Sequence, residues 1–414
     1  MTTSNSKPVC SRLITFLGKS DYKVTSYRNP NDTQQVFETK YVAEALTEFL
    51  EPAEVVVLAT DDAWEFHGES FSTAIRSHTA TMLRRVVFPM GNSQSGLWAQ
   101  FDLLKNELRL PAVERTRSIA LDITLGFRSA PFFCAGVLSF SQLVDEFAPN
   151  VSIYYGAFEA KQGNETDIWD ITSFSQLITW SSSIMLLLKT GRADGLADAT
   201  DAIGRSLAKQ WSLGDRKGPA PNLRQLGEAL GRFGGDLETV RTGSLLLGDQ
   251  NSMSSVTALL NAIATVNSSA DAIPPLVDVL DRIRSVIEPL NTQDRLSRPK
   301  GIQALKSLAN LYWQMGRFAE AASTMREAYI TQFATSAADC PGQTNFSKED
   351  RESAELEWFK SDEHFAQEIA HVRNDIEHAG YNAQPMSPER IKSKIRDLIE
   401  KLTAFERSLP SHDA

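Results

Sequence analysis

An arginine and a histidine stand five positions apart in a stretch whose apolar pattern predicts a helix. The segment HVRNDIEH, residues 371–378, contains Arg373, Asn374 and His378. On an ideal helix the first and last of these lie about 140° apart around the axis, and their long side chains can converge at the tips. Arginine can fork two hydrogen bonds to a phosphate, and histidine exchanges protons near neutral pH. These groups suit metal-independent RNA cleavage, although the same spacing also arises on solvated helix faces.

A second candidate site lies at residues 121–129, LDITLGFRS, where a strand pattern passes into a turn and the start of a helix. Thr124, Gly126 and the amides entering the helix from Phe127 can face a phosphate or a ribose, and Arg128 can clamp it. The helix dipole favours negative charge at such a point. The alternative is an ordinary capped strand–helix junction, in which Asp122 and Thr124 satisfy backbone groups.

Short apolar runs in the first part of the chain alternate with amphipathic stretches, and this pattern predicts a parallel sheet flanked by helices. We expect strands at residues 12–17, 55–59, 118–123 and 151–155, with a weaker one at 85–88. The turns after the first two contain Gly18, Ser20 and Thr60. Because ligands of open α/β sheets bind beyond the carboxyl ends of strands, these residues are candidate ligand contacts.

The remainder of the chain has helical periodicity, after a polar segment at residues 161–165 that we interpret as a linker, with a boundary near 160–167. We expect helices at residues 169–188, 194–211, 222–246, 254–266, 274–290, 300–312, 351–379 and 387–409. Residues 308–329 are typical of one tetratricopeptide-like helical hairpin, and a loop is expected at 336–350. The predicted fold class is therefore α/β, with a mainly parallel Rossmann-like sheet, followed by an all-α part.

Composition narrows the class of protein further. The chain has 414 residues, of which 42% are hydrophobic, and this length favours two or three domains. Three cysteines, widely separated, suggest neither a disulfide framework nor a metal site and favour a reducing cytoplasm. A formal net charge of −10 argues against non-specific coating of nucleic acid, so that any RNA contact is expected to be local. Neither a signal peptide nor a membrane span is predicted.

The sequence resembles the CARF–HEPN ribonucleases associated with type III CRISPR systems. Arg373, Asn374 and His378, followed by residues 379–382, AGYN, are similar to the R-x4-6-H motif of HEPN ribonucleases. Residues 122–126, DITLG, are similar to the D-x-T-H-G motif of one branch of the CARF sensors, with Leu125 in the position of the usual histidine. Residues 16–22, 38–41, 56–60, 153–160 and 168–172 extend the resemblance over nearly the whole chain, and it is weakest from about 195 to 300.

The resemblance implies a CARF sensor at residues 1–165, a helical connector at 166–335 and a HEPN ribonuclease core at 336–414. It implies a cytoplasmic single-stranded RNA endoribonuclease of antiviral defence, activated by a cyclic oligoadenylate. Cyclic tetra-adenylate is the first choice of activator and cyclic hexa-adenylate the second. A homodimer, or a higher oligomer, would enclose the ring on its two-fold axis and form one shared catalytic cleft. Arg373, Asn374 and His378 are the expected catalytic residues. The expected ligand-binding residues are Gly18, Ser20, Thr60, Asp122, Thr124, Gly126, Phe127 and Arg128.

The sequence is also compatible with several other interpretations. The chain could be a non-catalytic nucleotide-sensing scaffold or interaction protein, in which Arg373 and His378 are inert. A different RNA-modifying enzyme on the same scaffold is a further alternative. Leu125 removes an imidazole from the ligand turn, so the resemblance leaves open whether the sensor degrades its activator. The basic run of residues 390–401 is interpreted as a solvated helix face, and His67 and His78 are interpreted as packing or surface residues.

Overall fold

The computed structural model describes residues 10–78, 81–109, 118–127, 129–144, 150–213, 223–249, 251–268, 274–333, 348–381 and 383–402. The chain divides into two compact units, which we treat separately. Unit 1 comprises Met1–Thr179 and Ser206–Ala220, and unit 2 comprises Trp180–Arg205 and Pro221–Ala414. The three-part division suggested by the sequence stays a prediction.

Unit 1 is built on an eight-stranded sheet in the order β3-β2-β8-β7-β6-β1-β4-β5. Its central strands are β1 (Cys10–Leu17), β4 (Glu54–Ala59), β5 (Met82–Val87), β6 (Ser118–Asp122) and β7 (Asn150–Gly156). All five run parallel, and β1 pairs with both β4 and β6. The direction in which strands are added therefore reverses at β1, so that a crevice forms between the carboxyl ends of β1 and β6.

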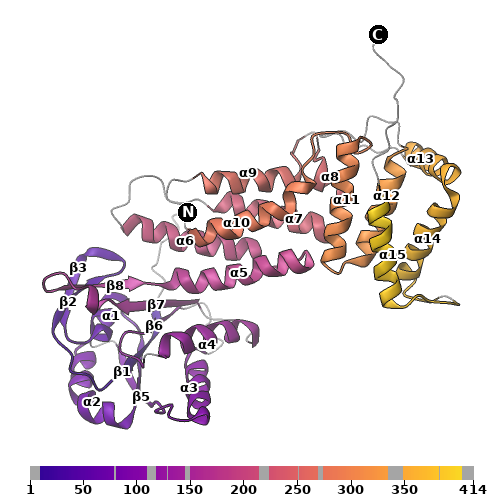
Figure 1. The fold of residues 1–414 in the computed structure, drawn as a ribbon. Coiled ribbons are helices and arrows are strands. Elements are labelled where there is room, and N and C mark those ends of the chain that lie inside the picture. Colours follow the sequence, from indigo (N-terminus) through magenta and orange to yellow (C-terminus); the bar gives the residue numbers. More distant parts are fainter. Residues whose placement is uncertain are drawn as a thin grey trace, which may run out of the picture. The chain divides into compact units, whose positions relative to one another are not determined.

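Helices cover both faces of this sheet, which makes three layers (Figure 1). The helices α1 (Val42–Leu50) and α2 (Asp61–Arg76) pack with alternate strand residues such as Leu13 and Val57. On the other face, α3 (Gln94–Glu107) and α4 (Ala130–Val144) pack with Ile14, Val56 and their neighbours. Successive strand side chains point to opposite faces, so a strand buried on both faces needs a continuous apolar run. This arrangement confirms the predicted α/β class.

Three further strands widen the sheet beyond the expected set. The antiparallel pair β2 (Thr25–Asn29) and β3 (Asp32–Thr39) joins through β8 (Glu165–Asp170), which also pairs with β7. A short 3-10 helix, η2 (Phe158–Ala160), precedes β8. The strand β8 thus lies where the sequence suggested the end of a linker. Its inward residues Thr166 and Ile168 are buried, while its outward residues are mostly exposed, and such short polar alternation resembles a loop in sequence.

Unit 2 is helical, as expected. Its elements, together with two helices shared with unit 1, are α5 (Thr172–Thr190), α6 (Leu196–Leu213), α7 (Arg224–Glu238), α8 (Thr242–Leu246), α9 (Ser255–Asn267), α10 (Pro274–Ile287), η3 (Glu288–Leu290), α11 (Pro299–Gln314), α12 (Phe318–Thr331), α13 (Lys348–Ser361), α14 (Glu363–Glu377) and α15 (Pro388–Lys401). Trp180 is fully buried, and its indole N–H donates to Thr200 at 2.9 Å. Helices α11 and α12 form the expected helical hairpin through Gly316, whose φ is +74°.

The single helix predicted at residues 351–379 is wrong, because the structure breaks it into α13 and α14 at Asp362. Asp362 has non-helical backbone angles (φ −153°, ψ 75°), and its carboxylate accepts a hydrogen bond from the amide of Phe365 at 3.1 Å. Aspartate is a strong helix N-cap because its oxygen satisfies an otherwise unpaired amide of the first turn. The predicted loop at 336–350 lies largely outside the described residues.

Two glycines of unit 2 provide a matched stability test. A Cβ on Gly301 of α11 would lie 2.1 Å from the carbonyl oxygen of Arg295, whereas a Cβ on Gly235 of α7 would meet no atom within 4 Å. We expect Gly301→Ala to lower the free energy of unfolding by about 2 kcal/mol or more, because backbone must move. Gly235→Ala should raise it by about 0.5–1 kcal/mol through helix propensity. Denaturation midpoints measure both, and equal midpoints for the two variants would contradict this close contact.

Candidate functional site

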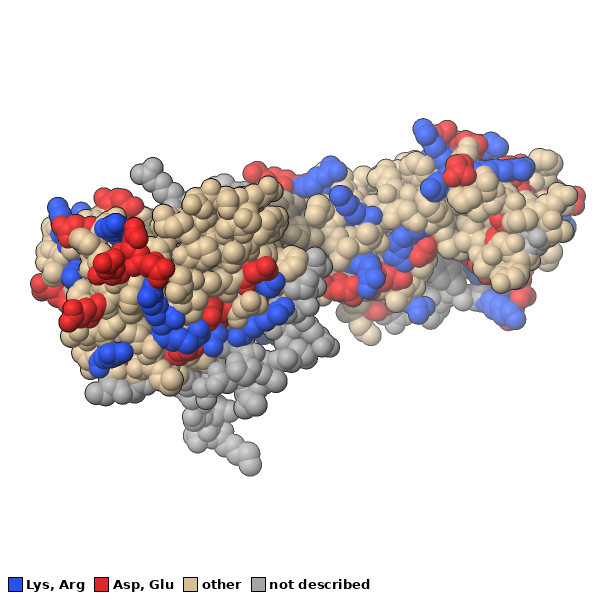
Figure 2. Space-filling view, turned by 90° about the horizontal axis from the view of Figure 1, so that it is seen from below, with Lys and Arg blue, Asp and Glu red and all other residues tan. Residues whose placement is uncertain are grey.

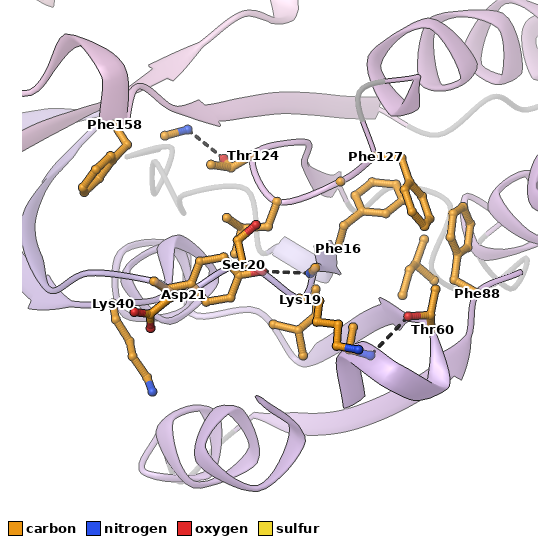
Figure 3. Close-up of a pocket in the computed structure, with 18 of the residues that line it drawn as sticks. Phe16, Lys19, Ser20, Asp21, Lys40, Thr60, Phe88, Thr124, Phe127 and Phe158 are labelled. Atoms are coloured by element: carbon orange, nitrogen blue, oxygen red, sulfur yellow. Dashed lines mark hydrogen bonds between the residues drawn. The ribbon is translucent and has the colours of Figure 1, made fainter. Parts of the chain in front are cut away.

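A pocket of about 690 Å³ opens at the carboxyl ends of the parallel strands of unit 1. Loops after β1, β4, β6 and β7 contribute to its wall, together with residues that follow β5 (Figure 3). The lining residues are Phe16, Leu17, Gly18, Lys19, Ser20, Asp21, Tyr22, Lys23, Tyr27, Lys40, Leu58, Thr60, Asp62, Ala63, Phe88, Met90, Thr124, Leu125, Gly126, Phe127, Tyr155, Gly156, Phe158 and Glu159. The pocket therefore occupies the crevice where an open α/β sheet binds ligands.

The structure brings most of the predicted ligand residues together. Gly18, Ser20, Thr60, Thr124, Gly126 and Phe127 all line the pocket. Asp122 does not line it, because its side chain is fully buried beneath the turn. Arg128 lies outside the described residues. The six predicted residues that line the pocket come from three strand ends, which are far apart in the sequence and adjacent only in the sheet.

Asp122 holds the turn in shape from below. One carboxylate oxygen accepts from the hydroxyl of Thr15 at 2.6 Å, and the other accepts from the hydroxyl and the amide of Thr124 at 2.6 and 3.0 Å. The Thr124 hydroxyl in turn accepts from the amide of Gly156 at 2.8 Å. These bonds match the capped-junction alternative for Asp122 and Thr124, and they join the ends of β1, β6 and β7.

Burial of Asp122 has a consequence for stability at different pH values. Desolvation raises the pKa of Asp122 above its usual range, although its bonds to Thr124 and Thr15 act in the opposite direction. The Asp122 carboxylate therefore binds a proton more tightly in the folded state than in the unfolded chain. The stabilisation that this proton provides is fully present at pH values below the unfolded pKa, and it is lost as the pH rises through the folded pKa.

Asp122→Asn should remove this dependence, because the amide can keep the Thr124 bonds and reverse the Thr15 bond. We expect the stability of the variant relative to the wild type to improve as the pH rises from about 4, the ordinary pKa of an aspartate, toward neutrality. Urea midpoints across this range provide the measurement, with the exposed pocket residue Asp62 changed to asparagine as the control. A wild-type to variant difference that stays constant with pH would contradict the assignment.

Close packing around the pocket explains two of the glycines. A Cβ on Gly18 would lie 3.2 Å from the carbonyl oxygen of Leu125 and from the hydroxyl of Tyr22. A Cβ on Gly126 would lie 2.8 Å from the Cβ of Ala130, at the start of α4. Both turns therefore approach their neighbours more closely than a larger residue allows. Leu125 packs partly buried against the core, where the resembled family has a histidine.

Aromatic side chains gather at one end of the pocket. Phe16 meets Phe88 edge to face, with ring centroids 5.5 Å apart, and Phe88 stacks on Phe127 at 6.2 Å with an interplanar angle of 24°. Phe127 remains 38% exposed and Phe88 is buried. Figure 3 shows these three rings together, while Phe158 and Lys40 lie at the opposite end. An exposed ring supported by a second ring is suited to stacking with a planar aromatic ligand.

Charged groups of both signs also line the pocket. Lys19, Lys23 and Lys40 supply cations, and Asp21, Asp62 and Glu159 supply anions. The Lys19 ammonium lies 3.3 Å from Asp62 in an exposed pair, which salt and solvent screen strongly. Thr60 caps the first turn of α2 by accepting from the amide of Ala63 at 3.2 Å. Cations in a pocket that also contains an exposed aromatic ring are suited to an anionic ligand with a planar ring.

Several residues that line the pocket were not predicted from the sequence. Phe88 ends the weak strand prediction, and Phe158 follows the turn after β7, so their positions at strand ends were an available signal. Lys40 follows β3, a strand that the sequence did not indicate. Tyr22 lines the pocket as well. The signal that could have found these residues is proximity to the carboxyl edge of the sheet.

The second candidate site is the end of α14 in unit 2. Arg373 is half-exposed, whereas Asn374 and His378 are exposed, and His378 is the C-cap residue of the helix. The His378 amide donates to the carbonyl of Asn374 at 2.9 Å. Arg373 forms an ion pair with Glu377 at 2.8 Å, one helical turn away. All three predicted residues are thus accessible from solvent, and the Arg373 guanidinium already has an anionic partner.

The polypeptide after α14 folds back in a defined way. Ala379 and Gly380 have positive φ values of 52° and 72°, and the Gly380 amide donates to the carbonyl of Asp375 at 2.9 Å. The buried Asp375 carboxylate accepts from the amide of Met386 at 3.1 Å. Such a left-handed helix end satisfies the last carbonyls of α14. It fixes the direction of the chain beside His378.

Basic residues of α15 mostly have acidic partners. Lys394 and Lys401 lie 2.6 and 3.8 Å from Glu368, and Arg396 lies 3.1 Å from Glu400. The Lys394 contact holds the pKa of Glu368 below its usual range. These ion pairs agree with a solvated helix face. On the face of the molecule that Figure 2 draws, blue and red side chains lie close together in several places, with uncharged surface between them.

Within the described residues, no group of three or more His, Cys, Asp or Glu side chains could hold a metal ion. A search of the same residues for helices that are both long and apolar enough to cross a bilayer found none.

Comparisons with known proteins add a distant structural similarity. No protein-family model matches the sequence, and no curated protein matches it significantly. Among solved structures, the chain is similar to Enterococcus italicus Csm6 bound to cyclic hexa-2′-fluoro-hexa-dAMP. The sequence identity is 13%, the TM-score is 0.42, and the alignment covers 94% of this chain and 92% of that chain.

Proposed function

We propose that this protein is a CARF–HEPN effector of type III CRISPR antiviral defence, a single-stranded RNA endoribonuclease that a cyclic oligoadenylate activates. The observation that carries the proposal is the pocket of unit 1. It lies at the switch point of a parallel sheet and offers Phe127 for base stacking and Lys19, Lys23 and Lys40 for phosphate. We assign the catalytic part to Arg373, Asn374 and His378, all of which are accessible from solvent.

A cyclic oligoadenylate has the chemistry that this pocket would bind. Each nucleotide has a planar adenine, a ribose and one negative phosphate. An even-membered ring has two equal halves, and a two-fold symmetric homodimer could bind one half in the pocket of each subunit. A cyclic tetra-adenylate or hexa-adenylate satisfies this symmetry. The pocket contains Leu125 where an imidazole could assist cleavage of the ring, so ring binding without ring degradation is the simpler expectation.

The residues of α14 would cleave RNA by internal attack. The ribose 2′-oxygen forms a bond to the adjacent phosphorus, and the bond from phosphorus to the 5′-oxygen breaks. One proton leaves the 2′-hydroxyl and another is delivered to the departing 5′-oxygen. We assign proton transfer to His378, stabilisation of the phosphorane charge to Arg373, and orientation of one of these groups to Asn374. Side chains from two subunits would share one cleft.

Activation would be a shift between conformations of the dimer. An activator that binds one geometry more tightly raises the population of that geometry. Coupling between two such sites is typically about 1–3 kcal/mol, equivalent to about 5- to 150-fold in affinity. Through its ion pair with Arg373, Glu377 would compete with a phosphate for the guanidinium.

The same ion pair favours a second candidate function. If Glu377 keeps the guanidinium occupied, the chain would be a non-catalytic nucleotide-sensing scaffold. The two functions differ in one assay, cleavage of a fluorogenic single-stranded RNA in the presence of EDTA with each cyclic oligoadenylate. Cleavage that requires one ring size supports the ribonuclease. Measurable ring binding without cleavage for any ring would favour the scaffold, and failure of every ring to bind would contradict the sensor.

A further inference from the structure

His67 of α2 is a buried histidine that does not line the pocket, yet it contacts the loop that forms much of the pocket wall. Its side chain is 5% exposed. Its Nε2 lies 2.8 Å from the carbonyl oxygen of Ser20. Residues 18–23, which we name the pocket loop, follow β1 outside any helix or strand, and all six line the pocket. His67 therefore supports the pocket from behind.

The hydrogen-bond partners determine which ring nitrogen of His67 carries a proton. A carbonyl oxygen can only accept, so Nε2 donates its hydrogen to Ser20. The other nitrogen, Nδ1, faces the hydroxyl of Tyr41 at 3.4 Å, and this hydroxyl lies 2.6 Å from the Ser70 oxygen. Tyr41 is itself fully buried in the core of unit 1. The ring is thus tied both to the core and to the pocket loop.

A stacked ring gives the pocket loop a second attachment to His67. The rings of Tyr22 and His67 have centroids 4.6 Å apart and an interplanar angle of 27°. The Tyr22 hydroxyl accepts a hydrogen bond from the amide of Gly18 at 2.8 Å, and so closes the loop on itself. His67 therefore contacts the loop by hydrogen bonding at Ser20 and by stacking at Tyr22.

We propose that His67 is a positioning residue, whose Nε2–H bond to Ser20 holds the pocket loop so that Lys19, Ser20 and Lys23 face an anionic ligand. This inference rests on the proposed function for the identity of the ligand, but not for the conformation of the loop. An unanchored loop would have to be ordered when the ligand binds, and the ordering entropy would weaken binding. The sequence places His67 more than forty positions from Ser20, and only the packing of α2 against the end of β1 brings them together.

Two substitutions separate the hydrogen bond from the packing. Glutamine at position 67 has an amide N–H close to the position of Nε2 and can still donate to Ser20. Phenylalanine keeps a planar ring against Tyr22 but has no donor, and it leaves the Ser20 carbonyl without this partner. His78→Phe is the matched control, because His78 follows α2 and contacts Glu48 and Phe37 instead of the pocket loop.

The first measurement is limited trypsin digestion, with cleavage after Lys19 and Lys23 followed by mass spectrometry. We expect His67→Phe to accelerate both cleavages about tenfold, and His67→Gln and His78→Phe to stay within about threefold of the wild type. The second measurement is the affinity for cyclic tetra-adenylate and cyclic hexa-adenylate. We expect a loss of about tenfold for His67→Phe, equivalent to about 1.4 kcal/mol, and little change for the others.

Each possible outcome either supports the proposed role of His67 or contradicts it. Wild-type digestion and affinity in His67→Phe would overturn it, and so would faster digestion with unchanged affinity. Equal losses in His67→Gln and His67→Phe, with equally lowered melting temperatures, would overturn it in favour of simple core packing. If the wild type binds neither ring, the proposed function fails, while digestion after Lys19 and Lys23 still tests whether His67 holds the loop.

Discussion

The double variant Arg373→Ala, His378→Ala is expected to lose activated RNA cleavage while it binds the cyclic oligoadenylate as the wild type does. The two side chains lie at the exposed end of α14 in unit 2, whereas the ligand pocket lies in unit 1. Removal of a general acid or base costs about 10²- to 10⁴-fold in rate. Removal of a donor to a developing negative charge costs about 10²- to 10³-fold.

The single variants should each lose about 10²-fold or more, and the double variant should lose less than the product of the two. Groups that act together in one transition state are not additive, because either loss already disables the shared step. The measurement is the initial rate of fluorogenic RNA cleavage in EDTA at saturating activator. Ring affinity, measured on the same samples, separates a catalytic defect from a sensor defect.

Matched controls are present in the same unit. Arg396 is exposed and forms an ion pair with Glu400 one turn away, as Arg373 does with Glu377. His371 is exposed on α14, two turns before His378. Arg396→Ala and His371→Ala should keep the wild-type rate within about threefold, in line with small surface effects. Full activity in His378→Ala would remove this residue from the mechanism, and equal losses in the controls would indicate a general effect of surface charge.

Phe127→Ala should weaken binding of the cyclic oligoadenylate by about 5- to 150-fold, which corresponds to about 1–3 kcal/mol for one base stacked on an aromatic ring. Phe127 is 38% exposed at the pocket, and Phe88 supports it from behind. The concentration of activator needed for half-maximal cleavage should rise by a similar factor. The maximal rate should return at saturating activator, because the active conformation itself is unchanged.

Titration of each ring against the variant provides the measurement, together with the melting temperature of each sample. Phe127→Trp should restore binding, because a larger aromatic ring keeps the stacking surface. Phe132→Ala is the control, since Phe132 is 83% exposed on α4 and does not line the pocket. Unchanged ring affinity in Phe127→Ala would place the base elsewhere in the pocket.

The parallel strands of unit 1 could be predicted from the sequence because a strand that is buried on both faces leaves a continuous apolar run in the sequence. Strand β4, for example, is buried on both faces, so nearly every one of its residues is apolar. The strands β2, β3 and β8 were not predicted, because they lie toward one edge of the sheet and consist mostly of polar residues. Such short polar stretches are compatible with loops, and only their pairing in space distinguishes them.

Helix boundaries were likewise only partly predictable from the sequence. Residues 351–379 contain no glycine or proline that would mark an interruption, so the sequence predicted one helix instead of two. The capping bond from Phe365 to Asp362 decides where α14 begins. Whether aspartate acts as a cap or as an exposed helix residue depends on backbone angles that tertiary packing selects.

For the candidate sites, the sequence by itself determined the residues that follow each strand and the Arg373, Asn374 and His378 set on one helix. These are short-range relations, and strand ends and helical turns have regular spacing. Only the tertiary structure decided that Asp122 points into the core and that Phe88 joins Phe127 in the pocket. It also decided that His67 supports the loop at Ser20. The physical reason is that these contacts join residues far apart in the sequence, and the packing of the layers brings them together.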